Sequence, residues 1–123
     1  MTAPLSQDVK NIRVSWAIDY LIHECTRIAN EHGWEGKSFG EDIALMHSEL
    51  SEALEAHRAG HDSTEMWFAA PDGKPEGIPS EFADVIIRIF HRAGEEGIDI
   101  AEALLQKMMY NETRPYRHGG KTL

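Results

Sequence analysis

The chain has 123 residues, 41% of them hydrophobic, and a formal net charge of −9 at pH 7. This length suits a single domain over residues 1–123, and the acidic balance argues against non-specific binding to nucleic acid or to an anionic membrane. The sequence shows no apolar run of membrane length and no charged-then-apolar leader, so we expect a cytoplasmic protein with neither a nucleic-acid nor a membrane partner.

Helical periodicity accounts for the first half of the chain. Apolar residues recur at intervals of three and four from about residue 6 to residue 32, which predicts a first helix. A second helix is expected over residues 39–59. Ser38 and Glu41 have the spacing of a capping box at its start, and Gly60 follows its last turn.

A long loop separates the second helix from the third. Residues 61–78 contain glycine and proline at intervals and no period, which predicts a loop with a short hairpin around residues 71–73. A third helix is expected over residues 80–96. It is apolar nearly all the way round, except for a narrow polar strip that includes Glu81 and Asp84. We therefore expect this helix to be buried on most sides, with the strip facing solvent or a polar site.

The fourth predicted helix covers residues 99–113, with Asp99 as its N-cap. Its inner face begins apolar and then continues with Lys107, Asn111 and Arg114, which indicates that this face leaves the core and enters a site. A basic tail follows over residues 114–123. From Lys107 onward the chain has four basic residues and one acidic residue, a net charge of +3 (Lys107, Arg114, Arg117 and Lys121 against Glu112). A phosphate-binding role fits this end of the chain.

Two acidic pairs lie within the second and third helices. Glu49 with Glu52, and Glu81 with Asp84, are each spaced i, i+3, so the two carboxylates of a pair share one helix face. If the two helices face each other, four carboxylates meet in one small volume, where like charges raise one another's pKa unless a cation is bound. Mg²⁺ prefers such oxygen ligands, and Mn²⁺ is a second possibility. The pairs therefore predict a metal site.

A magnesium site beside a cationic helix fits metal-assisted hydrolysis of a phosphoanhydride. Mg²⁺ in proteins is usually shared with substrate phosphates, which Lys107, Asn111 and Arg114 are placed to bind. A carboxylate not needed by the metal serves as general base for the attacking water. We assign that role to Glu52, with Glu49 as the second catalytic carboxylate. Trp34, in a predicted loop, either stacks on a nucleobase or packs against the protein.

These motifs resemble the MazG-like members of the all-α nucleoside triphosphate pyrophosphohydrolases, a group that includes dimeric dUTPases and phosphoribosyl-ATP pyrophosphatases. The family pattern is Glu-Glu-x-x-Glu followed by Glu-x-x-Asp. The second motif matches fully, and the first matches at Glu49 and Glu52 but has Ser48 in place of the leading glutamate. The resemblance covers about residues 41–121, and its anchors are four segments: 45–53, 81–85, 97–100 and 107–115.

The resemblance implies a four-helix-bundle fold and a Mg²⁺-dependent activity that cleaves the α–β phosphoanhydride of a nucleoside triphosphate, (d)NTP, to (d)NMP and pyrophosphate. It also implies a homodimer or homotetramer, with Lys107 and Asn111 contacting phosphate or supporting the metal ligands. An independent reason for oligomerisation is the first helix, which is apolar at Val14, Trp16 and Ile18 as well as on its main stripe.

Two other readings stay open at this point. Because Ser48 stands where the motif has a glutamate, the chain could also be a regulatory or interaction module that has the same helical fold and has lost most or all of its activity. A helical protein that binds a metal without catalysis is the third reading. The preferred base and sugar, the number of ions and the biological role do not follow from the sequence.

Overall fold

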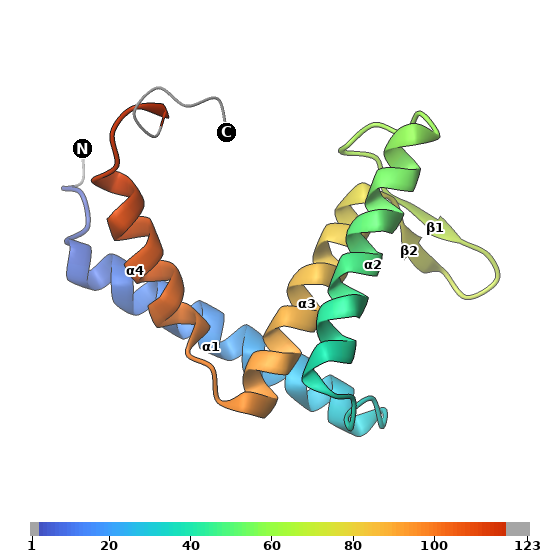
Figure 1. Ribbon diagram of the computed structural model, residues 1–123, viewed down its shortest axis with the longest axis horizontal. Coiled ribbons are helices and arrows are strands. Elements are labelled where there is room, and N and C mark those ends of the chain that lie inside the picture. Colours follow the sequence, from blue (N-terminus) through green and yellow to red (C-terminus); the bar gives the residue numbers. More distant parts are fainter. Residues whose placement is uncertain (1–2, 118–123) are drawn as a thin grey trace. The chain divides into compact units, whose positions relative to one another are not determined.

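The computed structural model describes residues 3–117 and is all-α apart from one two-stranded hairpin (Figure 1). The expected all-α class is confirmed. Lys121 and the rest of the basic tail beyond residue 117 lie outside the described residues. Among the helices that are described, none is long and apolar enough to cross a membrane. The elements in chain order are α1 (Gln7–Glu31), α2 (Phe39–Arg58), β1 (Trp67–Ala69), β2 (Lys74–Glu76), α3 (Ile78–Glu96) and α4 (Ile100–Glu112).

The chain divides into two compact units. The central unit, Ile22–Ile98, contains the end of α1, all of α2, the hairpin and α3. The terminal unit consists of the chain up to Leu21 and from Asp99 onward, and it contains the first part of α1 together with α4. Both acidic pairs predicted from the sequence belong to the central unit.

The start of α2 is fixed by the predicted capping box. The Ser38 hydroxyl accepts a hydrogen bond from the Glu41 backbone N–H at 3.1 Å, and the Ser38 backbone N–H donates to Glu41 Oε2 at 2.8 Å. Two of the orphan donors of the first helical turn are thereby satisfied. At the other end Ala59 caps the helix and Gly60 leaves it with a positive φ of 90°. The predicted helix over residues 39–59 is confirmed.

The loop before α3 contains the predicted hairpin. Strands β1 and β2 pair antiparallel, with Trp67 opposite Glu76 and Ala69 opposite Lys74. Gly77 then turns the chain into α3 at φ 113°, where an added Cβ would overlap the carbonyl oxygen of Glu65. A side chain at Gly77 is excluded both by this overlap and by the backbone conformation. Helix α3 begins at Ile78, two residues earlier than predicted.

Helices α2 and α3 lie side by side and run antiparallel (Figure 1). The polar strip of α3 faces α2, with Glu81 buried and Arg88 paired to Glu49, and Arg92 beside the strip is also buried. Phe82 and Ile86, on the apolar part of α3, are exposed in the single chain. The prediction that α3 is buried on most sides is therefore wrong for one copy of the chain. The strip turns inward because its charged groups find partners on α2.

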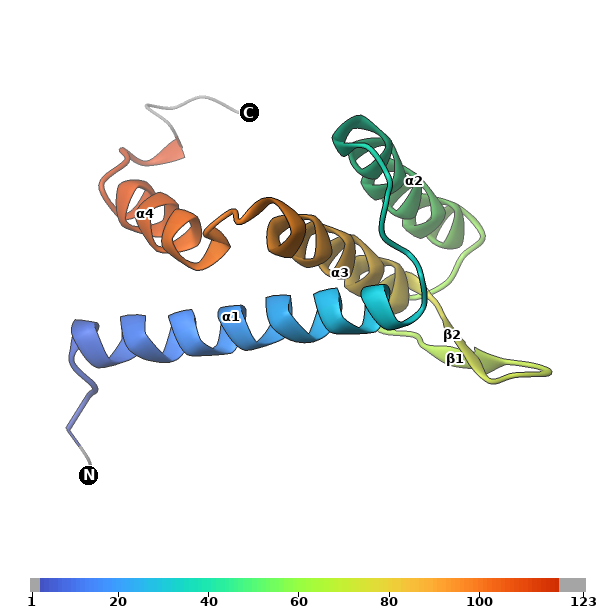
Figure 2. The ribbon, with the colours of Figure 1, turned by 90° about the horizontal axis from the view of Figure 1, so that it is seen from below.

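The last turns of α1 pass beside α3 (Figure 2). Gly94 permits this approach, because a Cβ at that position would overlap Thr26 Oγ1. The Thr26 hydroxyl is held in place, since it donates a 2.7 Å hydrogen bond to the Ile22 carbonyl. This packing places the end of α1 and the loop that follows it at the same face of the central unit as the acidic pairs.

Candidate functional site

Three of the four predicted carboxylates converge. Glu49 and Glu52 on α2 and Glu81 on α3 each offer one carboxylate oxygen, and these atoms all lie within 4.8 Å of one another. Glu49 and Glu81 are buried, at 8% and 9% exposure, whereas Glu52 is exposed. Asp84 lies one turn beyond Glu81, is half-buried, and lines a pocket together with Glu49 and Glu52. We call Glu49, Glu52 and Glu81 the carboxylate triad.

Glu81 has the most perturbed titration in the triad. Its pKa is raised to about 8, first by burial and then by its close neighbours Glu52 and Glu49. Its Oε2 atom is buried and has no hydrogen-bond partner among the described residues. Buried polar atoms are normally satisfied, so an orphan oxygen in a carboxylate cluster indicates a missing proton or cation.

Glu49 is stabilised as a carboxylate. Arg88, from α3, donates from Nε to Glu49 Oε1 at 2.9 Å, and its Nη2 atom lies 2.8 Å from the same oxygen in an ion pair. Burial by itself would raise the Glu49 pKa, but the hydrogen bonds from Arg88 and Glu81 and the Arg88 charge together lower it. The pKa of Asp84 is raised, mainly by burial and by the charge on Glu49, with Arg88 and Lys74 opposing the shift. The site therefore combines one carboxylate of lowered pKa, Glu49, with two carboxyls of raised pKa, Glu81 and Asp84.

A pocket of about 660 Å³ opens beside the triad, within the central unit. This volume is in the usual range for sites that bind small molecules. Its lining combines charged and apolar side chains. The charged or titratable group is Lys37, Asp42, Glu49, Glu52, Lys74, Asp84, Arg88 and His91, and the remaining lining is Cys25, Ile28, Ala29, Trp34, Leu45 and Ile87. The predicted base-stacking residue Trp34 thus lines the same pocket as the carboxylates.

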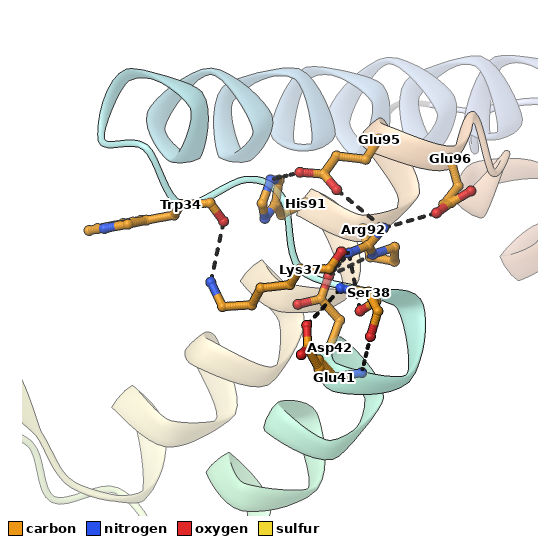
Figure 3. A network of polar contacts seen from close by, with 9 residues as sticks. All are labelled: Trp34, Lys37, Ser38, Glu41, Asp42, His91, Arg92, Glu95 and Glu96. Atoms are coloured by element: carbon orange, nitrogen blue, oxygen red, sulfur yellow. Dashed lines mark hydrogen bonds and ion pairs between the residues drawn. The ribbon is translucent and has the colours of Figure 1, made fainter.

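A second ion-pair network, which includes the pocket-lining residue Asp42, joins α2 to α3 (Figure 3). Arg92 pairs with Asp42, with Nη2 to Oδ2 at 2.5 Å and Nε to Oδ2 at 2.6 Å, and Nη2 also donates to the Lys37 carbonyl at 2.7 Å. Its Nη1 atom donates to Glu96 at 2.9 Å and lies 3.2 Å from Glu95. The network fixes the first turn of α2 against the last turns of α3, and so sets the register in which the acidic pairs meet.

The predicted phosphate-binding residues lie in the other unit. Lys107 and Asn111 are exposed on α4, and Arg114 follows the helix. Lys107 Nζ lies 6.0 Å from the centroid of the Tyr110 ring, and Arg114 Cζ lies 5.7 Å from it. Their binding of a phosphate stays a prediction. The cations that the structure places beside the carboxylates are Arg88 and Lys74, which the sequence reasoning did not assign to the site.

Ser48, which departs from the motif, is exposed on α2. Its hydroxyl donates a 2.7 Å hydrogen bond to the Leu45 carbonyl, so it is engaged with its own helix. The side chain of Ser48 offers no charge to a cation. The carboxylates that converge here are therefore the three of the triad, with Asp84 on the same pocket lining.

Comparison of the chain with models of known protein families, with curated proteins and with solved structures found no match. Three convergent carboxylates, a buried oxygen without a partner among the described residues and two cations on the pocket lining can bind a divalent cation and an anion together. The apolar side chains in the same lining suit a ligand that also has a flat or apolar part.

Proposed function

We propose that the protein is a Mg²⁺-dependent nucleoside triphosphate pyrophosphohydrolase of the MazG-like type, which converts a (d)NTP to (d)NMP and pyrophosphate. The observation that carries this proposal is the convergence of Glu49, Glu52 and Glu81, with a buried unpartnered oxygen on Glu81, beside a pocket large enough for a small organic ligand. Mn²⁺ is the expected substitute ion, because it takes the same oxygen ligands.

The residues fit a hard divalent ion. The triad offers oxygen ligands only, and neither cysteine nor histidine belongs to it, which favours Mg²⁺ or Mn²⁺ over zinc. Glu81 holds a proton that a cation would replace, and its orphan Oε2 would gain a partner. Asp84, one helical turn away on the pocket wall, is the fourth ligand in this proposal.

The side chains divide the chemistry among them. Mg²⁺, when bound, would neutralise phosphate charge and polarise a phosphoryl oxygen as a Lewis acid. Glu52 is the exposed member of the triad and lines the pocket, so it is free to accept the proton of an attacking water as general base. Glu49, whose pKa is lowered by its contact with Arg88, would serve as an ionised ligand. Trp34, on the pocket lining, would stack on the nucleobase.

Product analysis tests this proposal. Purified protein is incubated with Mg²⁺ and a panel of canonical and modified (d)NTPs. Nucleoside monophosphate, nucleoside diphosphate, pyrophosphate and inorganic phosphate are then resolved. We expect monophosphate plus pyrophosphate, lost in EDTA and in Glu52→Gln. The matched control is Glu55→Gln, since Glu55 is exposed on α2 near Arg58 and lies outside the triad and the pocket lining. Release of diphosphate plus phosphate would show that the site cuts a different bond.

The surplus apolar surface supports a homodimer or homotetramer. Phe82 and Ile86 on α3 and Leu50 and Leu54 on α2 are all exposed in the single chain. Exposed apolar residues gathered on two adjacent helices are typical of subunit interfaces. Sedimentation equilibrium measures this directly, and a monomer mass across the concentration range would remove the proposal. Cytoplasmic location stays a prediction.

The second candidate is a regulatory module of the same fold without activity. It is favoured by Arg88, which already neutralises one triad carboxylate, and by Ser48, which lacks the charge of the motif. Heat protection separates the candidates. A metal that binds only the folded state raises the melting temperature, so a rise with Mg²⁺ supports a metal site, and no rise combined with no turnover supports the module.

A further inference from the structure

Arg88 uses only one edge of its guanidinium group. Its Nε and Nη2 donors, which form the side edge, both end on Glu49 Oε1 at 2.9 and 2.8 Å. Arginine has five N–H donors in a fixed planar fork. Among the described residues Nη1 donates no hydrogen bond, so the end edge, made of Nη1 and the second Nη2 hydrogen, has no protein partner. Arg88 also lines the pocket.

Arg92, one turn further along α3, is a structural arginine of the same unit and serves as a comparison for Arg88. Its Nε, Nη1 and Nη2 atoms all donate to protein acceptors, on Asp42, Glu96 and Lys37. The Arg92 side chain is 7% exposed, whereas that of Arg88 is 32% exposed. A counter-ion for Glu49 alone would need only the side edge of Arg88. The free edge belongs to a residue that lines the pocket, so it is available to a ligand there.

We propose that Arg88 binds a phosphate group of the substrate through this free edge while its side edge keeps hold of Glu49. The inference rests on the proposed function and adds a substrate-binding residue to it. Arginine binds phosphate through two parallel N–H donors, a geometry that lysine does not offer. Because Arg88 is anchored to a triad carboxylate, the phosphate it binds is the one that would also approach the triad.

Charge at the pocket also requires a cation in this position. Glu49, Glu52 and Asp84 line the pocket and would repel a polyphosphate. Arg88 is the cation in direct contact with the triad. Lys74, from β2, also lines the pocket, but its Nζ lies 3.5 Å from Glu76 Oε1 and its side chain is 65% exposed. Lys74 therefore adds a mobile point charge, while Arg88 adds a fixed two-donor contact.

Binding of inorganic tripolyphosphate in the presence of Mg²⁺, measured by isothermal titration calorimetry, tests the inference without depending on the base or on turnover. The variants are Arg88→Gln and Arg88→Lys. Arg58→Gln is the matched control, because Arg58 is an exposed arginine on α2 outside the pocket lining. Binding of Mn²⁺ alone, followed by electron paramagnetic resonance, reports the metal site separately. Thermal melts verify folding, and Arg88→Lys preserves the charge opposite Glu49 if Arg88→Gln is unstable.

We expect Arg88→Gln to weaken tripolyphosphate binding about tenfold or more, as for loss of a charge-assisted contact, with Arg88→Lys intermediate and Arg58→Gln within about twofold. Mn²⁺ binding alone should be unchanged or tighter. Equal losses in Mn²⁺ and tripolyphosphate binding would mean that Arg88 only supports Glu49, and unchanged tripolyphosphate binding would also overturn the inference. If the wild-type protein hydrolyses nucleotides and Arg88→Gln binds tripolyphosphate as tightly as the wild type, this inference is refuted and the proposed function is not. A wild-type protein that binds neither probe refutes the proposed function as well.

Discussion

Replacing Arg92 by methionine should destabilise the central unit more than any other single loss of charge in it. Arg92 and Asp42 are both buried, and the two Arg92 contacts to Asp42 Oδ2 measure 2.5 and 2.6 Å. Methionine retains much of the side-chain volume but leaves the Asp42 carboxylate buried without its cation. The Lys37 carbonyl also loses its 2.7 Å donor.

The expected magnitude follows from these contacts. Removing one partner of a buried ion pair costs about 3–5 kcal/mol, because the remaining charge stays desolvated. Such a loss is a large part of the roughly 5–15 kcal/mol that holds a typical domain together. Replacing both partners, as in Asp42→Leu with Arg92→Met, should cost less than Arg92→Met alone, since no buried charge is then left unpaired.

Urea denaturation followed by far-ultraviolet circular dichroism measures these differences. Arg27→Met provides the matched control. Arg27 also makes two short ion pairs, at 2.6 Å to Glu24 and 2.9 Å to Glu31, but its side chain is 45% exposed, so it should cost only about 0–1 kcal/mol. If Arg92→Met costs no more than Arg27→Met, or if the double variant is worse than Arg92→Met, the argument from buried charge is refuted.

Two further predictions concern Glu81 and Gly94. The Glu81 pKa is about 8 in the folded chain against an ordinary value of 4.5, so the folded chain binds more protons than the unfolded chain between these two pH values. Melting temperatures in EDTA should therefore fall as pH rises across this range to about 8, and Glu81→Gln should flatten that slope. Mg²⁺ must displace this proton, so calorimetric Mg²⁺ affinity should rise up to about pH 8 and then level, and a pH-independent affinity would contradict it. Gly94→Ala should cost about 1–3 kcal/mol in urea denaturation because its Cβ meets Thr26 Oγ1, and Thr26→Ala in the same chain should recover most of the loss.

The helix boundaries were predictable because they depend on local chemistry. Ser38 with Glu41 and Asp99 with Glu102 satisfy backbone donors within one turn, and both caps form as the spacing predicts. The start of α3 was predicted two residues late, since Gly77 and not Ser80 precedes the first turn. That turn depends on the approach of the Glu65 carbonyl from the preceding segment, a contact that no local pattern records.

The carboxylates were predictable but their cationic partners were not. The i, i+3 spacing placed Glu49 with Glu52 and Glu81 with Asp84, and three of these groups meet. Arg88 was visible in the polar strip of α3, and Arg92 was not assigned to that strip. The partners of both arginines depend on the relative register of two helices separated by a long loop. The spacing of residues within one helix does not determine how α2 and α3 are aligned with each other.

The register itself explains why the candidate metal site lies where it does. Because α2 and α3 run antiparallel, Asp42 meets Arg92 and Glu49 meets Arg88, while at the next step along α2 Glu52 meets Glu81. The first two steps pair opposite charges, so neither step leaves a charge between the helices without its counter-ion.

The third step pairs like charges, and the cost is visible as the raised Glu81 pKa and the orphan Oε2 atom. A helix pair selected for stability alone would have a cation in place of Glu81, opposite Glu52, just as it has Arg88 opposite Glu49 and Arg92 opposite Asp42. The two complementary steps instead hold the mismatched one in a fixed geometry, so a divalent cation at this step, as proposed, would relieve the repulsion between its carboxylates.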